Sequence, residues 1–264
     1  MLPKKILIMG LPGSGKTFLA KKIVNSLKAD WFNADKIRGK YNDWDFSPSG
    51  IIRQVKRMKK LADDSKKKFV VTDFICPLKK QFQIYKPDFI IWMDTIKKSR
   101  YPRINKIFQK PKKYDIRVTS KDANLWSKII LDQIHPYKWK NNNPTVSLLG
   151  RWQPFHDGHY ELFLRAYQKT AQVIIYVKDV QNIGDNPFSF SQIKKLIDKK
   201  LVNLFKNRYK VKLAPNITNI FYGRKVGYKI KKINLDKKIQ KISGTKIRKQ
   251  MRAKGQLKQK KINR

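Results

Sequence analysis

The sequence is poor in three things: cysteine, acidic residues and long apolar runs. Cys76 is the single cysteine in 264 residues, so the chain cannot form an internal disulfide, and a cytosolic protein needs none. No apolar run reaches the roughly 18 residues of a membrane-spanning helix. The amino terminus passes from Lys4 and Lys5 into a strand-like segment rather than into the apolar core of a signal peptide. These shortages predict a soluble, cytoplasmic protein without membrane association.

Acidic residues number 18 against 62 Lys and Arg, which gives a formal net charge of +44. Such a charge attracts polyphosphate and nucleic-acid ligands. The excess is mostly lysine and is spread over the whole chain, as an A+T-rich genome would produce, so composition alone does not favour nucleic-acid binding. The densest block, 246–264, is expected to be a basic helix end followed by a disordered tail at 253–264. Nucleic-acid binding through this tail stays open but is not favoured.

Apolar runs and helical patterns alternate along the chain in two separate stretches. The first stretch, 1–140, contains three short runs with the length and β-branched content of buried strands, at 5–10, 69–75 and 88–94. After the polar residues 141–144 the pattern restarts within 145–252. Such alternation indicates parallel sheets covered by helices, and 264 residues suit two domains. We therefore expect an α/β protein of two Rossmann-like three-layer domains, followed by the basic tail.

A phosphate-binding loop stands between the first predicted strand and the first helix. Residues 10–17 read Gly-Leu-Pro-Gly-Ser-Gly-Lys-Thr and fit GxxxxGK[ST] in full. Backbone N–H groups of such a loop surround phosphate oxygens, Lys16 reaches the outer phosphates and Thr17 can ligate Mg²⁺. The predicted ATP contacts here are Gly10, Gly13, Ser14, Gly15, Lys16 and Thr17.

An acidic residue and an arginine follow the loop at a spacing typical of small-molecule kinases. Asp35 is expected to act as the base that takes the proton of an acceptor hydroxyl, while Arg38 holds an acceptor phosphate or sulfate. A surface ion pair at a helix start is the alternative, less favoured because the pair follows a P-loop. Cys76 is interpreted as structural, since Ile75 and Pro77 suggest a strand end.

The segments GLPGSGKT, FNADKIR, DFSPS, DFICP and RYPR…KYD make residues 3–118 similar to adenylylsulfate kinase. The resemblance implies phosphoryl transfer from ATP, with Arg100 and Arg103 in a basic lid that contacts the acceptor. The family's substrate arginine in FSxxDR is missing at Ile51, and Gln54 replaces the expected asparagine. The acceptor therefore stays open, because the same DxxR arrangement also resembles polynucleotide 5′-kinases and nucleoside kinases.

The second stretch has its own phosphate-binding pattern, GRWQPFHDGH at 150–159. In an HxGH turn, His156 and His159 can donate hydrogen bonds to the α- and β-phosphates of a nucleoside triphosphate, and Gly158 permits close approach of the backbone. A metal site is less favoured, because no third Cys or His accompanies the pair. The segment ISGTKIR at 242–248 gathers hydroxyls, N–H groups and cations at a predicted helix start and indicates a second phosphate clamp.

Together with Asp185-Asn-Pro-Phe-Ser189, these two motifs make residues 145–252 similar to nicotinamide mononucleotide adenylyltransferase. The resemblance implies an HxGH nucleotidyltransferase fold and attack of a nucleotide phosphate on the α-phosphate of ATP, with Mg²⁺ on the polyphosphate and no covalent intermediate. It implies that Asn186, Pro187 and Phe188 shape the acceptor pocket. It assigns ATP contacts to Gly150, Arg151, Gln153, Phe155, His156, Gly158, His159, Ser243, Thr245 and Arg248. Trp152 stands where that family usually has Phe.

The sequence therefore predicts a bifunctional ATP-dependent enzyme. Its catalytic residues are expected to be Lys16 and Asp35 for phosphoryl transfer, and His156 and His159 for adenylyl transfer to a nucleotide such as nicotinamide mononucleotide. A cytidylyltransferase, which shares HxGH and SxTxIR, is one alternative. A polynucleotide kinase in nucleic-acid repair is another, and a binding protein without turnover is disfavoured by the intact motifs. A sulfurylase and an aminoacyl-tRNA synthetase fit the second half less well.

Overall fold

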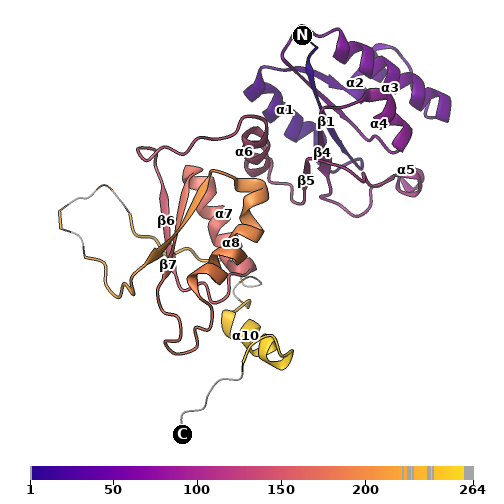
Figure 1. Ribbon diagram of the computed structural model, residues 1–264. Helices are drawn as coiled ribbons and strands as arrows, with labels where there is room; N and C mark the ends of the chain where they lie inside the picture. Colours follow the sequence, from indigo (N-terminus) through magenta and orange to yellow (C-terminus); the bar gives the residue numbers. More distant parts are fainter. Residues whose placement is uncertain are drawn as a thin grey trace. The chain divides into compact units, whose positions relative to one another are not determined.

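The computed structural model describes residues 2–221, 223–224, 227, 229–236, 239 and 241–258 (Figure 1). The chain divides into two compact units, Met1–Ile134 (unit 1) and His135–Arg264 (unit 2). Each unit is built on a parallel sheet, which confirms the predicted α/β class. In the described part of the chain, no helix is both long and apolar enough to cross a membrane.

Unit 1 has a five-stranded parallel sheet in the order β2-β3-β1-β4-β5. The central strands are mostly apolar and buried because helices cover both faces, with α1 packed on α6 and α3 packed on α4. Asn33, at the end of β2, is in register with Asp73 on β3, and Ile8 of β1 flanks the same residue. Polar groups therefore meet at the carboxyl edge of this sheet. The elements are β1 (Lys4–Gly10), α1 (Lys16–Leu27), β2 (Asp30–Asn33), α2 (Ala34–Lys40), α3 (Pro48–Asp63), β3 (Phe69–Phe74), α4 (Lys79–Tyr85), β4 (Phe89–Met93), α5 (Pro102–Ile107), β5 (Ile116–Val118) and α6 (Ala123–Ile134).

Cys76 lies two residues after the end of β3 and is fully buried in the core of unit 1. Burial raises the pKa of its thiol far above the usual value, so the group stays protonated. This environment agrees with a structural role.

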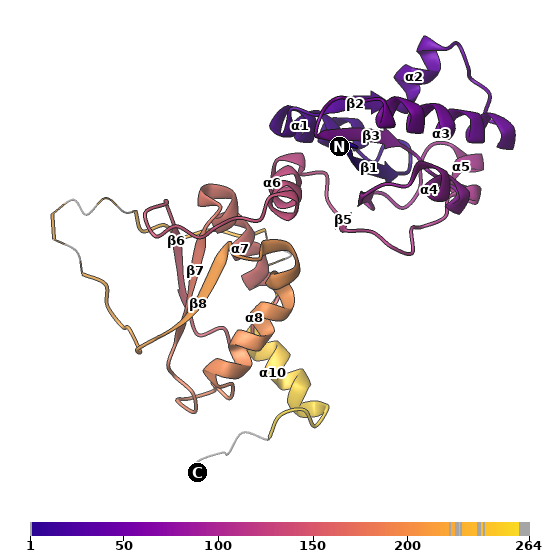
Figure 2. The same cartoon turned by 45° about the horizontal axis from the view of Figure 1, so that its top comes forward.

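Unit 2 has a three-stranded parallel sheet in the order β6-β7-β8. Helices α7 and α8 lie side by side on one face of it (Figures 1 and 2), where Phe163 and Tyr167 of α7 each meet Phe205 of α8 with ring centroids 4.9 Å apart. The elements are β6 (Val146–Gly150), α7 (Asp157–Thr170), β7 (Val173–Lys178), α8 (Phe190–Phe205), β8 (Tyr209–Ala214) and α10 (Gly244–Ala253). Of the predicted tail at 253–264, residues 259–264 lie outside the described residues.

The segment before β6 is held by a buried polar side chain, Gln172, directly before β7. Its Oε1 accepts from the hydroxyl of Tyr137 at 2.8 Å, and its Nε2 donates to Thr145 Oγ1 at 2.7 Å and to the Lys140 carbonyl at 2.9 Å. These bonds attach residues 137–145 to unit 2. The division between the units accordingly falls at Ile134, a few residues before the expected end of the first domain.

Candidate active sites

The P-loop of unit 1 depends on glycine at its turns. Gly10, Gly13 and Gly15 have φ values of 148°, 81° and 94°, in a region that other residues rarely adopt. A Cβ on Gly10 would lie 2.6 Å from the carbonyl oxygen of Met93. The loop is tied to the neighbouring strand end, since Thr95 Oγ1 donates to the carbonyl of Ser14 at 2.7 Å. The backbone is therefore fixed in a tight turn directly before α1.

Lys16 folds back over this loop. Its Nζ donates to the carbonyls of Gly10 and Leu11, each at 3.0 Å. Burial lowers the pKa of Lys16 to about 8, although the nearby carboxylates of Asp73 and Asp35 favour the charged form. A poorly solvated ammonium group close to two carboxylates is well suited to hold the phosphates of a nucleotide.

Asp73 is a site residue that the sequence reasoning missed. Its carboxylate is 1% exposed and accepts hydrogen bonds from Thr17 Oγ1 at 2.8 Å, from Asn33 Nδ2 at 2.9 Å and from Trp31 Nε1 at 2.7 Å. A buried carboxylate beside the P-loop hydroxyl offers the hard oxygen ligands that Mg²⁺ prefers. The signal was present in the sequence, because Asp73 is a carboxylate near the end of an otherwise mostly apolar run predicted to be a buried strand.

No cluster of three or more His, Cys, Asp or Glu side chains that could hold a metal ion occurs among the described residues. The pair formed by Thr17 and Asp73 fits Mg²⁺ in a different way. Because Mg²⁺ keeps several waters and takes phosphate oxygens of its nucleotide, one hydroxyl and one carboxylate are a sufficient protein contribution.

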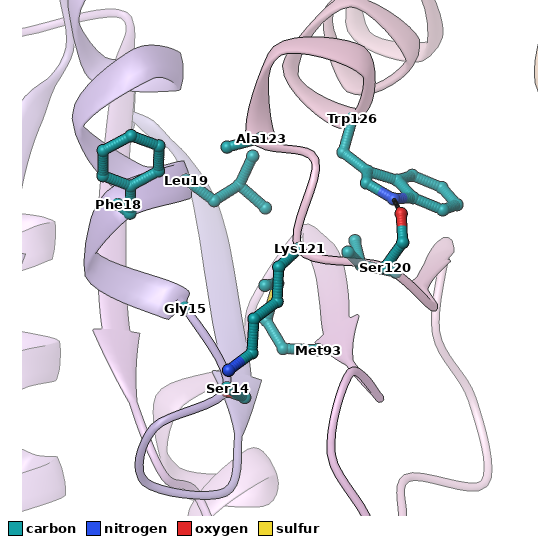
Figure 3. Close-up of a pocket in the computed structure, with 10 residues that line it drawn as sticks. Ser14, Gly15, Phe18, Leu19, Met93, Ser120, Lys121, Ala123 and Trp126 are labelled. Atoms are coloured by element: carbon teal, nitrogen blue, oxygen red, sulfur yellow. Dashed lines mark hydrogen bonds between the residues drawn. The ribbon is translucent and has the colours of Figure 1, made fainter. Parts of the chain in front are cut away.

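An apolar cavity of about 230 Å³ adjoins the P-loop within unit 1 (Figure 3). It opens beside Ser14 and Gly15, and Figure 3 shows the Lys121 side chain reaching toward Ser14 along one wall. Trp126 forms another wall, its Nε1 donating to Ser120 Oγ at 3.0 Å. The flat base of a nucleotide whose phosphates lie on the loop would be suited to such an apolar pocket.

Asp35 lies in the first turn of α2, whose N-cap Asn33 accepts a hydrogen bond from Lys36 N at 3.0 Å. It is close enough to Lys16 to favour the ammonium form. Arg38 is only 5% exposed, and its Nη1 donates to the carbonyls of Asp43 and Asp45, each at 2.9 Å. The structure therefore uses Arg38 to hold the loop after α2, which does not favour the predicted contact with an acceptor phosphate or sulfate.

The predicted lid arginines lie at the start of α5, Arg100 two residues before the helix and Arg103 in its first turn. Arg100 and Arg103 are both exposed, and the Arg100 guanidinium lies 5.0 Å from the centre of the Tyr101 ring.

In unit 2 the two histidines of the HxGH turn stack on one another at the start of α7. Their ring centroids are 3.7 Å apart. Nδ1 of His156 accepts from Gly158 N at 3.1 Å, and Nδ1 of His159 accepts from His156 N at 3.4 Å. Because each Nδ1 is an acceptor, the proton of the neutral ring lies on Nε2.

Burial keeps both rings uncharged. Burial lowers the pKa of His156. Burial also lowers the pKa of His159 to about 3, and the neighbouring His156 makes a smaller contribution in the same direction. At neutral pH each histidine is therefore a neutral Nε2–H donor.

The HxGH turn and the start of α10 share one cavity of about 170 Å³, although about ninety residues separate them in sequence. Ser243 caps α10 by accepting from Lys246 N at 3.2 Å. A Cβ on Gly244 would lie 2.7 Å from the Gln153 carbonyl oxygen, so only glycine permits this approach. The cavity is lined by Arg151, Trp152, Gln153, His156, His159, Gly244, Thr245 and Arg248.

Four residues predicted to contact ATP do not line this cavity. Gly150 packs against the Trp152 ring, Phe155 is buried beside His159, Gly158 lies under the His156 ring, and Ser243 caps α10. Three of these residues contact side chains that line the cavity, and Ser243 caps the helix that borders it.

The predicted acceptor segment is tied to the HxGH loop by Gln153. Its Nε2 donates to the Phe188 carbonyl at 2.8 Å, and its Oε1 accepts from Phe188 N at 2.9 Å. The side chain of Gln153 therefore joins two loops rather than pointing freely to a ligand. Asn186 is buried and donates to the Ile183 carbonyl, while its Oδ1 has no hydrogen-bond partner among the described residues. Pro187, between Asn186 and Phe188, is half-buried.

Asp185 is a second site residue to which the sequence analysis gave no role, although it begins the motif at 185–189. Its Oδ2 accepts from Arg248 Nε at 2.9 Å, and its Oδ1 accepts from Arg252 Nη2 at 2.6 Å. The hydrogen bonds from Arg252 and Arg248 hold the pKa of Asp185 below its usual value. Arg248 also donates to Thr245 Oγ1 at 3.2 Å and to the Gln153 carbonyl. Asp185 therefore orients the guanidinium that faces the cavity.

Replacing Asp185 with Asn is expected to raise the KM for ATP of unit 2 about tenfold, because a hydrogen bond between charged groups contributes about 1.5–3 kcal/mol. Steady-state kinetics with ATP varied against a saturating acceptor measure this. Asp198→Asn is the matched control, since Asp198 pairs with Lys194 on the surface of α8. Equal KM values for the two variants would contradict a positioning role for Asp185.

Comparisons with known proteins find two kinds of relatives. No protein-family model matches the chain. Nicotinamide-nucleotide adenylyltransferases of Methanococcus maripaludis strains C6 and C5 are 30% and 29% identical over 130 residues, covering 39% of this chain and 75% of each relative. Among solved structures, the adenylylsulfate kinase of Mycobacterium tuberculosis with AMPPNP and APS is 21% identical, with a TM-score of 0.45 over 50% of this chain and 98% of that chain.

The shikimate kinase of Aquifex aeolicus is 14% identical, with a TM-score of 0.39 over 49% of this chain and 95% of that chain. Because these TM-scores are below 0.5, the kinase-like character of unit 1 rests on its own P-loop and parallel sheet. The Methanococcus maripaludis strain C6 protein is 30% identical, and 75% of its length is covered, which shows the family of the chain. The chain thus belongs to the nicotinamide-nucleotide adenylyltransferase family, and carries a P-loop kinase-like unit ahead of the family's motifs.

Proposed function

We propose that the chain is a bifunctional ATP-dependent enzyme. Unit 2 transfers the adenylyl group of ATP to the phosphate of a nucleotide such as nicotinamide mononucleotide, and unit 1 transfers the γ-phosphoryl group of ATP to a small hydroxyl acceptor. The observation that carries the first activity is the meeting of His156, His159 and Arg248 around one cavity. The single buried free cysteine and the use of ATP support a cytoplasmic setting.

In unit 2, a phosphate oxygen of the acceptor attacks the α-phosphorus of ATP. The new P–O bond forms as the bond to the β-phosphate bridging oxygen breaks, and pyrophosphate leaves with the electron pair. Nε2–H groups of His156 and His159 donate to phosphate oxygens whose charge grows in this step. The guanidinium of Arg248 and the N-terminus of α10 hold the leaving pyrophosphate. No covalent bond to the protein is required.

In unit 1, Lys16 and the P-loop amides hold the β- and γ-phosphates. Asp35 orients the acceptor hydroxyl and takes its proton as the oxygen attacks the γ-phosphorus. Thr17 and Asp73 would hold Mg²⁺, which when bound neutralises phosphate charge.

Formation of NAD from ATP and nicotinamide mononucleotide, with release of pyrophosphate, tests the proposed activity of unit 2. We expect turnover with ATP and little with CTP. The Lys16→Met variant is the control, because it alters only the P-loop of unit 1 and should form NAD at the wild-type rate. Preferred use of CTP would instead support a cytidylyltransferase, and absence of turnover with both nucleotides would contradict nucleotidyl transfer to this acceptor.

A further inference from the structure

We infer that the acceptor of unit 1 is a nucleoside without a phosphate or sulfate group, and that its phosphorylated product is the nucleotide that unit 2 adenylylates. The inference rests on the proposed function and gives the kinase half its substrate class. It starts from the loop between α2 and α3, which follows the helix that carries Asp35.

The arginines of α3 that face this loop are engaged by its two carboxylates. Arg53 donates to Asp43 from Nε at 2.8 Å and from Nη2 at 2.9 Å, and to Asp45 Oδ2 at 3.0 Å. Arg57 donates to Asp43 Oδ2 at 3.0 Å and to Gln54 Oε1 at 2.7 Å. The hydrogen bonds from Arg53 and Arg57 hold the pKa of Asp43 well below its usual range, so these pairs persist at neutral pH.

Arg38 is engaged in the same loop through the carbonyls of Asp43 and Asp45. Arginine is especially suited to a phosphate or sulfate group, because its guanidinium can donate two hydrogen bonds to the oxygens of one such anion. Here Arg38, Arg53 and Arg57 direct their donors to the protein itself. The acceptor side of unit 1 is therefore suited to a molecule that carries a hydroxyl but no such anion.

The loop instead presents aromatic faces. Tyr41, Trp44 and Phe46 are 49%, 53% and 46% exposed, an unusual concentration of exposed rings within six residues. One face of two of these rings is covered, since the Arg57 guanidinium lies 4.3 Å from the centre of the Tyr41 ring and that of Arg38 lies 4.6 Å from the centre of the Phe46 ring. A Cβ on Gly39 would lie 3.8 Å from the Trp44 indole, so this ring rests against α2. Asp35 lies one helical turn before Gly39, on the same side of that helix. A flat heterocycle stacked on these rings would keep its attached sugar close to the base.

The two proposed reactions then connect chemically. The 5′-hydroxyl oxygen of a nucleoside attacks the γ-phosphorus of ATP, the γ-phosphorus–bridging-oxygen bond breaks, ADP leaves and the hydroxyl proton passes to Asp35. The phosphomonoester formed is the nucleophile that unit 2 requires. A nucleoside and two ATP molecules thus give a dinucleotide, ADP, pyrophosphate and a proton.

Three probes test the acceptor on the full-length protein: nicotinamide riboside, adenylylsulfate and an oligonucleotide with a 5′-hydroxyl. We expect phosphorylation of the riboside with kcat/KM at least tenfold above the other two, and formation of NAD from riboside and ATP alone. The Asp35→Asn variant should lose NAD formation from riboside while forming NAD from the mononucleotide normally. Faster phosphorylation of adenylylsulfate or of the oligonucleotide, or no phosphorylation of the riboside, would overturn the inference. NAD formation from nicotinamide mononucleotide and ATP tests unit 2 alone. A failure of the proposed adenylyl transfer would abolish this reaction, whereas a failure of the inference about unit 1 would leave it intact.

The proposed stacking of the base on the exposed rings of the loop, Tyr41, Trp44 and Phe46, has its own test. Because base–aromatic stacking contributes about 1–3 kcal/mol, Trp44→Ala or Phe46→Ala should raise the KM for riboside about 5- to 100-fold with little change in kcat. Trp44→Phe should restore most of the affinity. Tyr114→Ala, which removes an exposed ring packed on Trp92, is the control. Unchanged KM values in both alanine variants would overturn the stacking assignment.

Discussion

Replacement of His159 with Ala is expected to lower kcat for adenylyl transfer about 10²- to 10³-fold, the usual effect of removing one preorganised donor to a charge that grows in the transition state. His159 lines the cavity and its buried ring is fixed by His156, so water is a poor substitute for its Nε2–H group. The rate of NAD formation from nicotinamide mononucleotide measures the effect. Phosphoryl transfer by unit 1 of the same variant is the internal control and should be unchanged. A loss below about threefold would contradict the assigned role.

The pH dependence sharpens this prediction. Burial lowers the pKa of His159 to about 3, so the ring is neutral from about pH 4 upward and does not change its charge near pH 6.5. The part of the rate that depends on His159 should therefore be level between pH 5 and pH 8. A rate that rises as the pH falls through 6.5 would show that a charged imidazole is the active form, and would contradict the assignment of His159 as a neutral donor.

The P-loop and the HxGH turn could be predicted from sequence because their backbone geometry is local. A P-loop needs glycines at fixed positions, and Gly10 meets the Met93 carbonyl for that reason. The HxGH turn likewise places its two histidines by the geometry of one helix start, with His156 as the cap of α7. Both structures follow from short segments, so a single sequence is sufficient to recognise them.

Residues that act through distant partners were not predictable in this way. Asp185 meets Arg248 only because the loop after β7 and the start of α10 come together, 63 positions apart. Arg38 was expected to bind a ligand, but its partners are backbone carbonyls, which leave no trace in the residue types. The parallel sheets could be predicted from apolar runs, while the order β2-β3-β1-β4-β5 depends on packing that no short segment specifies.

Lys16→Met is expected to lower phosphoryl transfer by unit 1 about 10²- to 10³-fold, because it removes the only side-chain cation hydrogen-bonded to the P-loop carbonyls among the described residues. Adenylyl transfer by unit 2 should not change. Lys21→Met, on the exposed side of α1, is the matched control and should retain phosphoryl transfer. Retention of phosphoryl transfer by the Lys16 variant would show that the P-loop does not hold the transferred phosphate.

The pKa of Lys16 gives a second measurement on the same residue. Burial lowers this pKa to about 8, and bound phosphates would raise it again, so binding takes up a proton where the free lysine is neutral. ATP affinity of unit 1 should be constant below about pH 8 and should fall about tenfold per pH unit above it, until the pKa of the complex is reached. Titration calorimetry on the His159→Ala background, compared with the same background carrying Lys16→Met, isolates this binding. An affinity that is level to pH 10 would mean that Lys16 is charged over the whole range. Its pKa would then be close to that of a solvated lysine and would contradict the lowered value.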